Sequence, residues 1–328
     1  MNFDQLFLDF SNLKVIVLGD VMLDSYWWGH VERISPEAPV PVVTLDKKEL
    51  RIGGAGNVAL NTVALGAQTA IVSVIGNDED GIALTHLFRQ NGIDTSLLMV
   101  SDERITTNKT RIISRNQQMM RLDTEITTDI HVALEVKLLE RLKDEFIHNK
   151  PHVLIFEDYN KGVLTERLIQ QVVALCKQYQ VITTVDPKRK NFFSFKGVDI
   201  FKPNLKEVKE GLNLLIEDVN LHTLQSIHQQ LQSLLAHHIS LITLSEKGVF
   251  YQSPSISNII PTHIRNIADV SGAGDTVIAV ASLVYAATQN IELAAEMANI
   301  AGGLVCEEVG TAAINKQKLL DECKLLLA

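Results

Sequence analysis

The sequence is poor in cysteine, and its three cysteines lie far apart. Cys176, Cys306 and Cys323 form no C-x-x-C pair and have no histidine at zinc-finger spacing. These spacings indicate neither a disulfide framework nor a structural zinc site of that type. A reducing compartment fits such cysteine usage, and we therefore expect a cytoplasmic protein.

Positive charge and long apolar runs are also scarce. The 328 residues carry 39 acidic and 30 basic side chains. The resulting net charge of −9 leaves no electrostatic footprint for nucleic acid or an anionic membrane surface. The longest apolar stretch, residues 277–287 interrupted by Ser282, is well short of the roughly 20 residues that a membrane-spanning helix needs. Residues 1–13 lack the basic start and apolar centre of a signal peptide. We expect neither a nucleic-acid partner nor a membrane segment.

Short β-branched runs alternate with segments of helical periodicity, which is typical of βαβ units and a parallel sheet covered by helices. Strands are expected at residues 14–18, 69–75, 152–156, 181–185, 199–201 and 240–244, and the chain after residue 271 is almost entirely helical. Two further stretches, at about 39–52 and 105–123, alternate like strands with one wetted face. Because no repeat or long linker divides the chain, we expect one α/β domain over residues 1–328, with these two stretches as a small β-sheet lid.

The strongest motif is D-V-S-G-A-G-D-T at residues 269–276, directly before an apolar helix. Small residues ahead of a helix allow backbone N–H groups to approach an anion, and the helix dipole adds to the attraction. Gly272, Ala273 and Gly274 therefore predict a phosphate-binding turn. Asp275 beside that turn suits a base that takes a proton from an attacking hydroxyl. The same pattern also fits an aspartate that caps a helix after a glycine turn.

A second glycine-rich segment, G-G-A-G-N-V-A at residues 53–59, opens an earlier helix but lacks the spacing of a dinucleotide-binding loop. Together the two segments resemble the two signatures of the ribokinase-like (PfkB) family of carbohydrate kinases, and the resemblance runs from about residue 13 to about residue 318. It implies a three-layer α/β fold with a mainly parallel central sheet and a small β-sheet lid. It also implies that Gly53, Gly54 and Asn57 shape a sugar site, while the second signature supplies the anion hole and the base Asp275. Val280 departs from the signature, which usually has Ala or Gly there.

The resemblance assigns further residues in the order of the family's landmarks. Asp24 matches the acidic residue that binds sugar hydroxyls, a role that suits the strong, directional bonds of a carboxylate. Asn204 and Glu207 match an N-x-x-E motif that positions Mg²⁺, through water, and the nucleotide phosphates. A helix cap with Glu207 completing a capping box is the open alternative for this pair. The remaining assignments concern the nucleotide: Thr243, Ser245 and Gly248 in a phosphate-side loop, and Asn299 in a helix beside the adenine pocket.

Two segments narrow the expected substrate. Residues 33–42, with Arg33 and Glu37, resemble a stretch typical of the bacterial D-glycero-β-D-manno-heptose 7-phosphate kinases, and residues 156–164, with Lys161, resemble their D-Y-x-K-G-V-L segment. Prolines fix an extended backbone around Arg33 and Glu37, although a stiff, solvated edge strand fits equally well. A sugar phosphate needs cations, for which Lys161, Lys188, Arg189 and Lys190 are candidates; the last three also fit a solvated loop.

The resemblance therefore implies an ATP-dependent kinase that phosphorylates the anomeric hydroxyl of the heptose 7-phosphate, in ADP-heptose biosynthesis for lipopolysaccharide core or related surface glycans. ATP and Mg²⁺ are the implied cofactors, and a monovalent-cation site stays open. We expect a homodimer formed through the lid. No H-x-G-H motif is present, so we expect a separate protein to supply nucleotidyl transfer. The alternatives are another sugar or nucleoside kinase of the same family, and a nucleotide- or sugar-binding regulator that has lost catalysis.

Overall fold

The central layer of the protein is a mainly parallel β-sheet. In the computed structural model, which describes residues 2–327 except 116, 217 and 264, nine strands follow the order β13-β12-β11-β10-β9-β8-β1-β4-β5. Neighbours from β11 to β5 are parallel, whereas β12 and β13 form an antiparallel edge. The strand bounds are β1 Lys14–Gly19, β4 Gln68–Gly76, β5 Leu98–Ser101, β8 Val153–Glu157, β9 Ile182–Asp186, β10 Ile200–Phe201, β11 Ile239–Thr243, β12 Val249–Gln252 and β13 Ser257–Ile260. Residue 116, inside the expected lid stretch 105–123, and residues 1 and 328 of the expected domain lie outside the described part.

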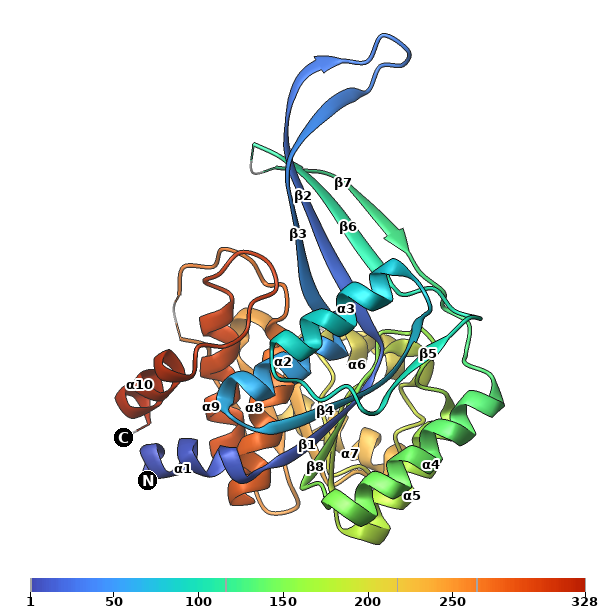
Figure 1. Ribbon diagram of the computed structural model, residues 1–328. Helices are drawn as coiled ribbons and strands as arrows, with labels where there is room; N and C mark the ends of the chain where they lie inside the picture. Colours follow the sequence, from blue (N-terminus) through green and yellow to red (C-terminus); the bar gives the residue numbers. More distant parts are fainter. Residues whose placement is uncertain (1, 116, 217, 264, 328) are drawn as a thin grey trace.

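Helices cover both faces of this sheet, giving three layers (Figure 1). One face carries α1 Phe3–Asp9, α2 Ala55–Leu65, α3 Glu79–Gln90, α8 Ala273–Thr288, α9 Ile291–Val305 and α10 Lys316–Leu326. The other carries α4 Val132–Asn149, α5 Glu166–Tyr179, α6 Leu205–Leu212 and α7 Leu221–Leu235. Within the described ranges, no helix has the length and apolar character needed to cross a membrane.

Strand β1 shows why the sequence adopts this layering. Val15 and Val17 pack into the core on the α8 side, and Ile16 and Leu18 pack into the core on the α5 side. A strand buried on both faces reads as a continuous apolar run, which is what parallel sheets require. The predicted α/β class, with a mainly parallel sheet and a smaller β-sheet, is confirmed.

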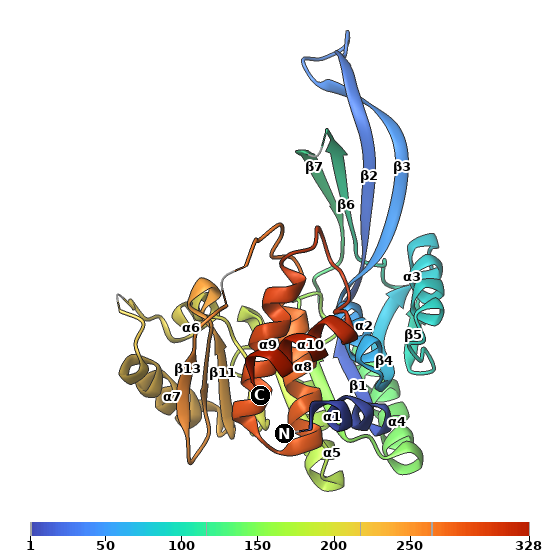
Figure 2. The ribbon, with the colours of Figure 1, turned by 90° about the vertical axis from the view of Figure 1, so that its left-hand side faces the viewer.

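The second sheet has four strands in the order β3-β2-β6-β7, namely β2 Val21–Ile34, β3 Pro41–Gly54, β6 Asn108–Ser114 and β7 Gln117–Thr124. β2 and β3 are each 14 residues long and extend as a hairpin arm away from the body (Figure 2). The sequence interpretation missed β2, because its first six residues are buried, the next five are half-buried and only the last three are exposed, so it has no uniform alternation. The stretch at 105–123 contains two strands, β6 and β7, which pair as a hairpin.

Candidate active site

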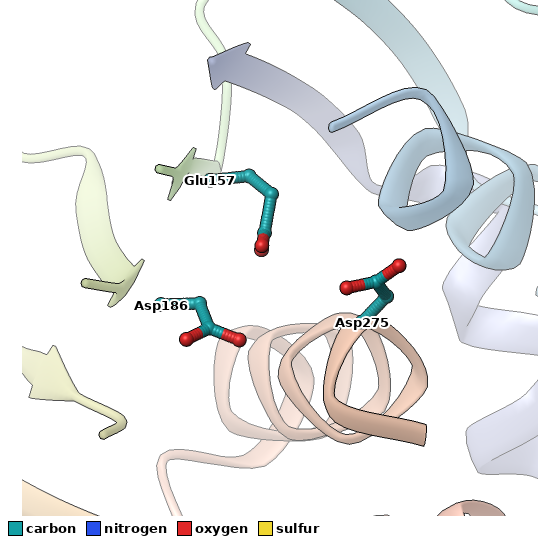
Figure 3. A group of neighbouring side chains, drawn as sticks. All are labelled: Glu157, Asp186 and Asp275. Atoms are coloured by element: carbon teal, nitrogen blue, oxygen red, sulfur yellow. The ribbon is translucent and has the colours of Figure 1, made fainter. Parts of the chain in front are cut away.

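Three acidic side chains meet at the carboxyl end of the central sheet. Glu157 ends β8 and Asp186 ends the neighbouring β9, and the strand register pairs the two residues directly. Asp275 enters from the first turn of α8, and the three carboxylates point toward a common space (Figure 3). One oxygen of each lies within 4.8 Å of the others. The carboxyl edge of a parallel sheet, beside a helix N-terminus, is where such folds usually bind ligands.

Asp275 is oriented by two hydrogen bonds from other elements. Asn57 of α2 donates from Nδ2 to Oδ2 at 2.7 Å, and the Tyr159 hydroxyl donates to Oδ1 at 2.7 Å. The turn ahead of α8 requires glycine at 272, where φ is +79° and a Cβ would lie 2.8 Å from the Asn57 amide nitrogen. Burial raises the pKa of Asp275, and the two hydrogen bonds oppose that rise. The carboxylate is therefore held in one orientation at the start of the helix.

The predicted anion turn passes directly beside this cluster. Gly272 is the N-cap of α8, and Ala273 is its first residue. A Cβ on Gly274 would lie 3.5 Å from Oδ2 of Asp186, so the turn runs along the carboxylates as well as along Asn57. The structure thus brings the two glycine-rich segments of the sequence together at Asp275.

Two lysines neutralise part of the acidic cluster. Lys202 Nζ lies 2.7 Å from Asp186 Oδ2, and Lys188 Nζ lies 3.1 Å from Asp186 Oδ1. Burial acts to raise the pKa of Asp186, but Lys188 and Lys202 hold it below its usual value. Glu157 is fully buried, and no donor from the described residues reaches either of its carboxylate oxygens. Burial, with the charges of Asp186 and Asp275, raises its pKa well above the usual value.

Asn204 and Glu207 form the N-terminal cap of α6. Asn204 Oδ1 accepts the Glu207 amide at 2.8 Å, and Glu207 Oε2 accepts the Asn204 amide at 2.8 Å. The other Glu207 oxygen accepts a bond from Lys188 at 2.7 Å. The capping box that the sequence left open is therefore present. Any role of this pair in arranging Mg²⁺ has to coexist with these bonds.

Asp24 lies at the base of the small sheet, in β2, and is 3% exposed. Its Oδ1 accepts a bond from Arg111 Nη1 of β6 at 2.6 Å. Gly53 allows β3 to pass close to it, since a Cβ there would lie 2.5 Å from Asp24 Oδ2. Gly54 then caps α2, which carries Asn57 to Asp275. One short segment thus connects the surroundings of Asp24 with those of Asp275.

The cations near Asp24 include Lys109, which was not singled out from the sequence. Lys161 Nζ is paired with Glu125 Oε2 at 2.6 Å and is mostly buried. Lys109, opposite Asp24 in the β2–β6 register, extends its Nζ to 5.6 Å from the centre of the Tyr159 ring. No carboxylate of the described residues lies within 4.0 Å of that amino group. Burial lowers the pKa of Lys109, and the charge of Asp24 opposes that shift.

Arg33 and Glu37 lie far from this cluster within one chain. Arg33 is near the outer end of β2, and Glu37 is in the turn at the tip of the arm (Figure 1). At about 3.3 Å per strand residue, Arg33 is roughly 30 Å along β2 from Asp24. Both side chains are exposed. A single chain therefore does not bring these two residues to its own carboxylate cluster.

The expected nucleotide residues lie at the end of β11, in the turn that follows it, and on α9. Thr243 ends β11 and forms a parallel bridge with Asn204. Ser245 adopts φ +57°, and its carbonyl accepts the Gly248 amide at 3.1 Å, which closes a tight turn. Asn299 Nδ2 donates to the Pro261 carbonyl at 2.9 Å, which ties α9 to the segment after β13.

Several residues at this edge were not assigned a role from the sequence. Asp20 accepts the backbone amides of Tyr159, Lys161 and Val163 at 2.9 to 3.0 Å and so shapes the loop after β8. Glu157, Asp186 and Tyr159 also went unassigned. The sequence does contain a signal for the three acidic residues. Asp20, Glu157 and Asp186 each stand within two residues of the end of an expected strand, where parallel sheets gather ligand-binding groups.

Comparison with known proteins gives a consistent result. Residues 12–318 match the model of a family described as pfkB family carbohydrate kinase. The chain is 37% identical over 321 residues to bifunctional protein HldE of Geobacter metallireducens, covering 97% of this chain and 64% of that protein. It is 38% identical over 303 residues to bifunctional protein HldE of Sulfurimonas denitrificans, covering 92% and 62%. The chain therefore spans less than two thirds of the length of these relatives.

Solved structures share the fold at low sequence identity. Phosphofructokinase-2 from Escherichia coli, in complex with potassium, gives a TM-score of 0.78 at 15% identity, covering 95% of this chain and 99% of that one. Arabidopsis thaliana ribokinase, complexed with ribose and ATP, gives 0.72 at 16% identity, covering 94% and 98%. At such identities the likeness shows the fold alone.

Proposed function

This chain belongs to the pfkB family of carbohydrate kinases, and we propose that it transfers the γ-phosphoryl group of ATP to the anomeric hydroxyl of D-glycero-β-D-manno-heptose 7-phosphate. One observation carries the phosphoryl-transfer chemistry. Asp275, buried at the start of α8 behind a glycine turn, has both carboxylate oxygens held by donors from other elements, Asn57 and Tyr159. Such an orienting shell suits a general base whose proton acceptor must face a bound hydroxyl.

In the proposed mechanism, Asp275 takes the proton of the sugar hydroxyl as its oxygen attacks the γ-phosphorus. The backbone at Gly272, Ala273 and Gly274 stabilises negative charge on the phosphoryl group in transfer. Asp24 accepts hydrogen bonds from the sugar and fixes its orientation, a role that its ion pair with Arg111 supports by holding the carboxylate in place. The small sheet serves as a lid that keeps water from receiving the phosphoryl group.

ATP is the co-substrate that the family implies, with Mg²⁺ as its companion ion. The acidic side chains at this edge fit a hard cation, because all offer carboxylate oxygens. Mg²⁺ neutralises the nucleotide phosphates when it is bound. Glu207 and Asn204 remain proposed to arrange its water shell, with Thr243, Ser245, Gly248 and Asn299 on the nucleotide side. A monovalent-cation requirement is an open part of this proposal.

The choice of a phosphorylated heptose rests on two supports. The segments at 33–42 and 156–164 resemble those of heptose 7-phosphate kinases, and the relatives named bifunctional protein HldE match the chain over nearly its whole length. The structure adds Lys109, an ammonium group without a carboxylate partner among the described residues, between Asp24 and Tyr159. We propose that Lys109 and Lys161 together receive the sugar phosphate, with Lys161 exchanging Glu125 for it.

A homodimer through the small sheet completes the proposal. Apolar side chains on this sheet and its arm are exposed, among them Ile34, Val40, Leu45, Leu50, Met120 and Leu122. Exposed apolar groups gathered on one element indicate an interface. In such a dimer, the arm would carry Arg33 and Glu37 toward the partner chain, where they could contact its sugar. Nucleotidyl transfer to the product is proposed to be a separate activity.

The test is ADP release from purified protein with ATP, Mg²⁺ and a panel of sugars. Heptose 7-phosphate is expected to give the highest kcat/KM, well above unphosphorylated heptose, fructose 6-phosphate or ribose. A higher value for another sugar would replace the heptose by that substrate, and no turnover with any sugar would favour a binding regulator.

Two lysine variants sharpen the substrate test. Lys109→Met and Lys161→Met are each expected to raise KM for the sugar phosphate by about tenfold or more, since a charge-assisted bond contributes roughly 1.5–3 kcal/mol. KM for ATP should change little. Lys190 was also a candidate from the sequence, but it is exposed and paired with Asp129 outside the carboxylate cluster, so Lys190→Met is the matched control. Equal effects on heptose and heptose 7-phosphate would contradict the phosphate assignment.

A further inference from the structure

The buried carboxylates at the sheet edge carry more negative charge than their lysines neutralise. Contacts within 4.8 Å join Glu157, Asp186 and Asp275, and Glu207 is joined to Asp186 through Lys188. With all groups ionised, these four carboxylates face two ammonium groups, those of Lys188 and Lys202, which leaves an excess of two negative charges. Burying unpaired charge is costly, so this excess is relieved either by a proton on Glu157, in line with its raised pKa, or by a bound cation.

Glu157 is the member of the cluster whose bonding capacity is unused. Both of its carboxylate oxygens are buried and have no donor among the described residues, and the side chain points between Asp186 and Asp275 (Figure 3). The Asp275 oxygens, in contrast, accept bonds from Asn57 and Tyr159. Asp186 accepts both lysines but keeps a second lone pair on each oxygen.

We propose that Glu157 and Asp186 bind a divalent cation of the magnesium class directly, before any nucleotide arrives, with Asp275 at the edge of its water shell. Two charges on the ion balance the excess of two, and oxygen ligands are those that such an ion prefers. This places the protein's own cation ligand at Glu157 rather than at Asn204 and Glu207, whose side-chain oxygens already accept hydrogen bonds. The inference deepens the proposed function and rests on it for its purpose, which is to prepare the site for phosphates.

Binding of Mn²⁺ to the full chain, measured by electron paramagnetic resonance without nucleotide or sugar, tests this inference. One Mn²⁺ per chain is expected, and Mg²⁺ should displace it. Glu157→Gln keeps the shape of the side chain and removes the charge, so it should weaken Mn²⁺ binding by at least about tenfold, since even residues behind the ligands commonly cost 10–100-fold. Glu135→Gln is the matched control: Glu135 is another buried carboxylate with an oxygen lacking a donor, but it lies on α4 beside Thr165 and Arg167.

Thermal melts supply a second readout that a purely structural role would not produce. Wild-type protein should melt at a higher temperature with saturating Mn²⁺, because a ligand of the native state stabilises it. Glu157→Gln should lose this shift and, without metal, melt at the wild-type temperature or above it, since like charges are removed. If that variant does not fold, Glu157→Ser makes the same test. Absence of nucleotide-free binding in the wild type, or undiminished binding in Glu157→Gln, would overturn the inference.

The two proposals fail separately. Turnover without nucleotide-free Mn²⁺ binding would remove the cation inference and leave the kinase reaction standing. Mn²⁺ binding without turnover on any sugar would remove the kinase reaction and leave the cation inference standing.

Discussion

Asp275→Asn is the sharpest test of the proposed chemistry, because the structure predicts that the change removes a base without removing a fold. Asparagine has nearly the shape of aspartate, so its oxygen can still accept the bond from Asn57. Its amide nitrogen then faces the Tyr159 hydroxyl, which can rotate and accept a bond instead of donating one. The substitution also removes one of several neighbouring negative charges, so the free energy of unfolding should be unchanged or higher.

The expected loss in kcat follows from the role of a general base. Such a group typically contributes 10²–10⁴-fold, which corresponds to about 3 to 5 kcal/mol in the activation free energy. Tyr159→Phe keeps the carboxylate and removes one orienting donor, so its loss should be smaller, about tenfold, in line with one hydrogen bond of about 1 to 1.5 kcal/mol. The two variants together separate the base from its orientation.

The assay is ADP release at saturating ATP and sugar, with thermal melts and nucleotide binding measured on the same samples. Asp275→Asn should bind ATP nearly as the wild type does. If the folded variant turns over within about tenfold of the wild-type rate, Asp275 is not the base, and the aspartate is then a helix-capping residue beside a glycine turn.

Three further outcomes are expected. Asn204→Ala should lower the free energy of unfolding by about 1 kcal/mol in urea melts, because it removes the α6 cap. Glu207→Gln keeps the cap acceptor and should instead raise the Mg²⁺ concentration that gives the half-maximal rate. If the Mg²⁺ dependence is unchanged, Glu207 is a capping residue only. Burial, helped by His228 and His238, lowers the pKa of His237 to about 3. Since an unfolded histidine titrates near 6.5, stability should fall by up to about 1.4 kcal/mol per unit as pH drops below about 6.5, and urea melts of His237→Gln should show a flatter slope. Met120→Glu on the small sheet should convert a dimer to a monomer in light scattering. Leu215 is fully exposed outside that sheet, so Leu215→Glu should leave the dimer intact. A monomeric wild type would refute the lid dimer.

The alternation of strands and helices allowed β1, β4, β8, β9, β10 and β11 of the central sheet to be predicted, because these strands are largely buried and read as apolar runs, whereas β5, β12 and β13 were not predicted. The arm is different. β2 passes from a buried base at Val21 to an exposed end at Ile34, and its outer half is stabilised by pairing with β3 rather than by burial. Such a gradual change of exposure along the strand leaves no periodic signal in the sequence, so only the β3 half of the arm was predicted.

The contact between Asn57 and Asp275 was predictable only in part. Each residue was singled out from its own glycine-rich segment, but 218 positions separate them. Their hydrogen bond depends on α2 packing against α8, a tertiary arrangement that local spacing does not encode. Tyr159, the second partner of Asp275, lies on a loop whose path is set by Asp20 accepting three backbone amides. A sequence pattern does not reveal such a loop path.

Three acidic residues at the ends of β1, β8 and β9 show why a strand-end carboxylate cannot be assigned a role from its position alone. Asp20 has its lone pairs satisfied by the loop after β8, so its charge serves to shape the backbone. Asp186 is balanced by Lys188 and Lys202, which reach it from the chain that follows β9 and β10. Glu157 receives neither kind of partner. The same local pattern thus has three physical outcomes, and the difference depends on which distant donors the fold delivers. Natural sequences rarely leave a buried charge unpaired except where function requires it, which makes the residue with the least internal compensation the most informative position at this edge of the sheet.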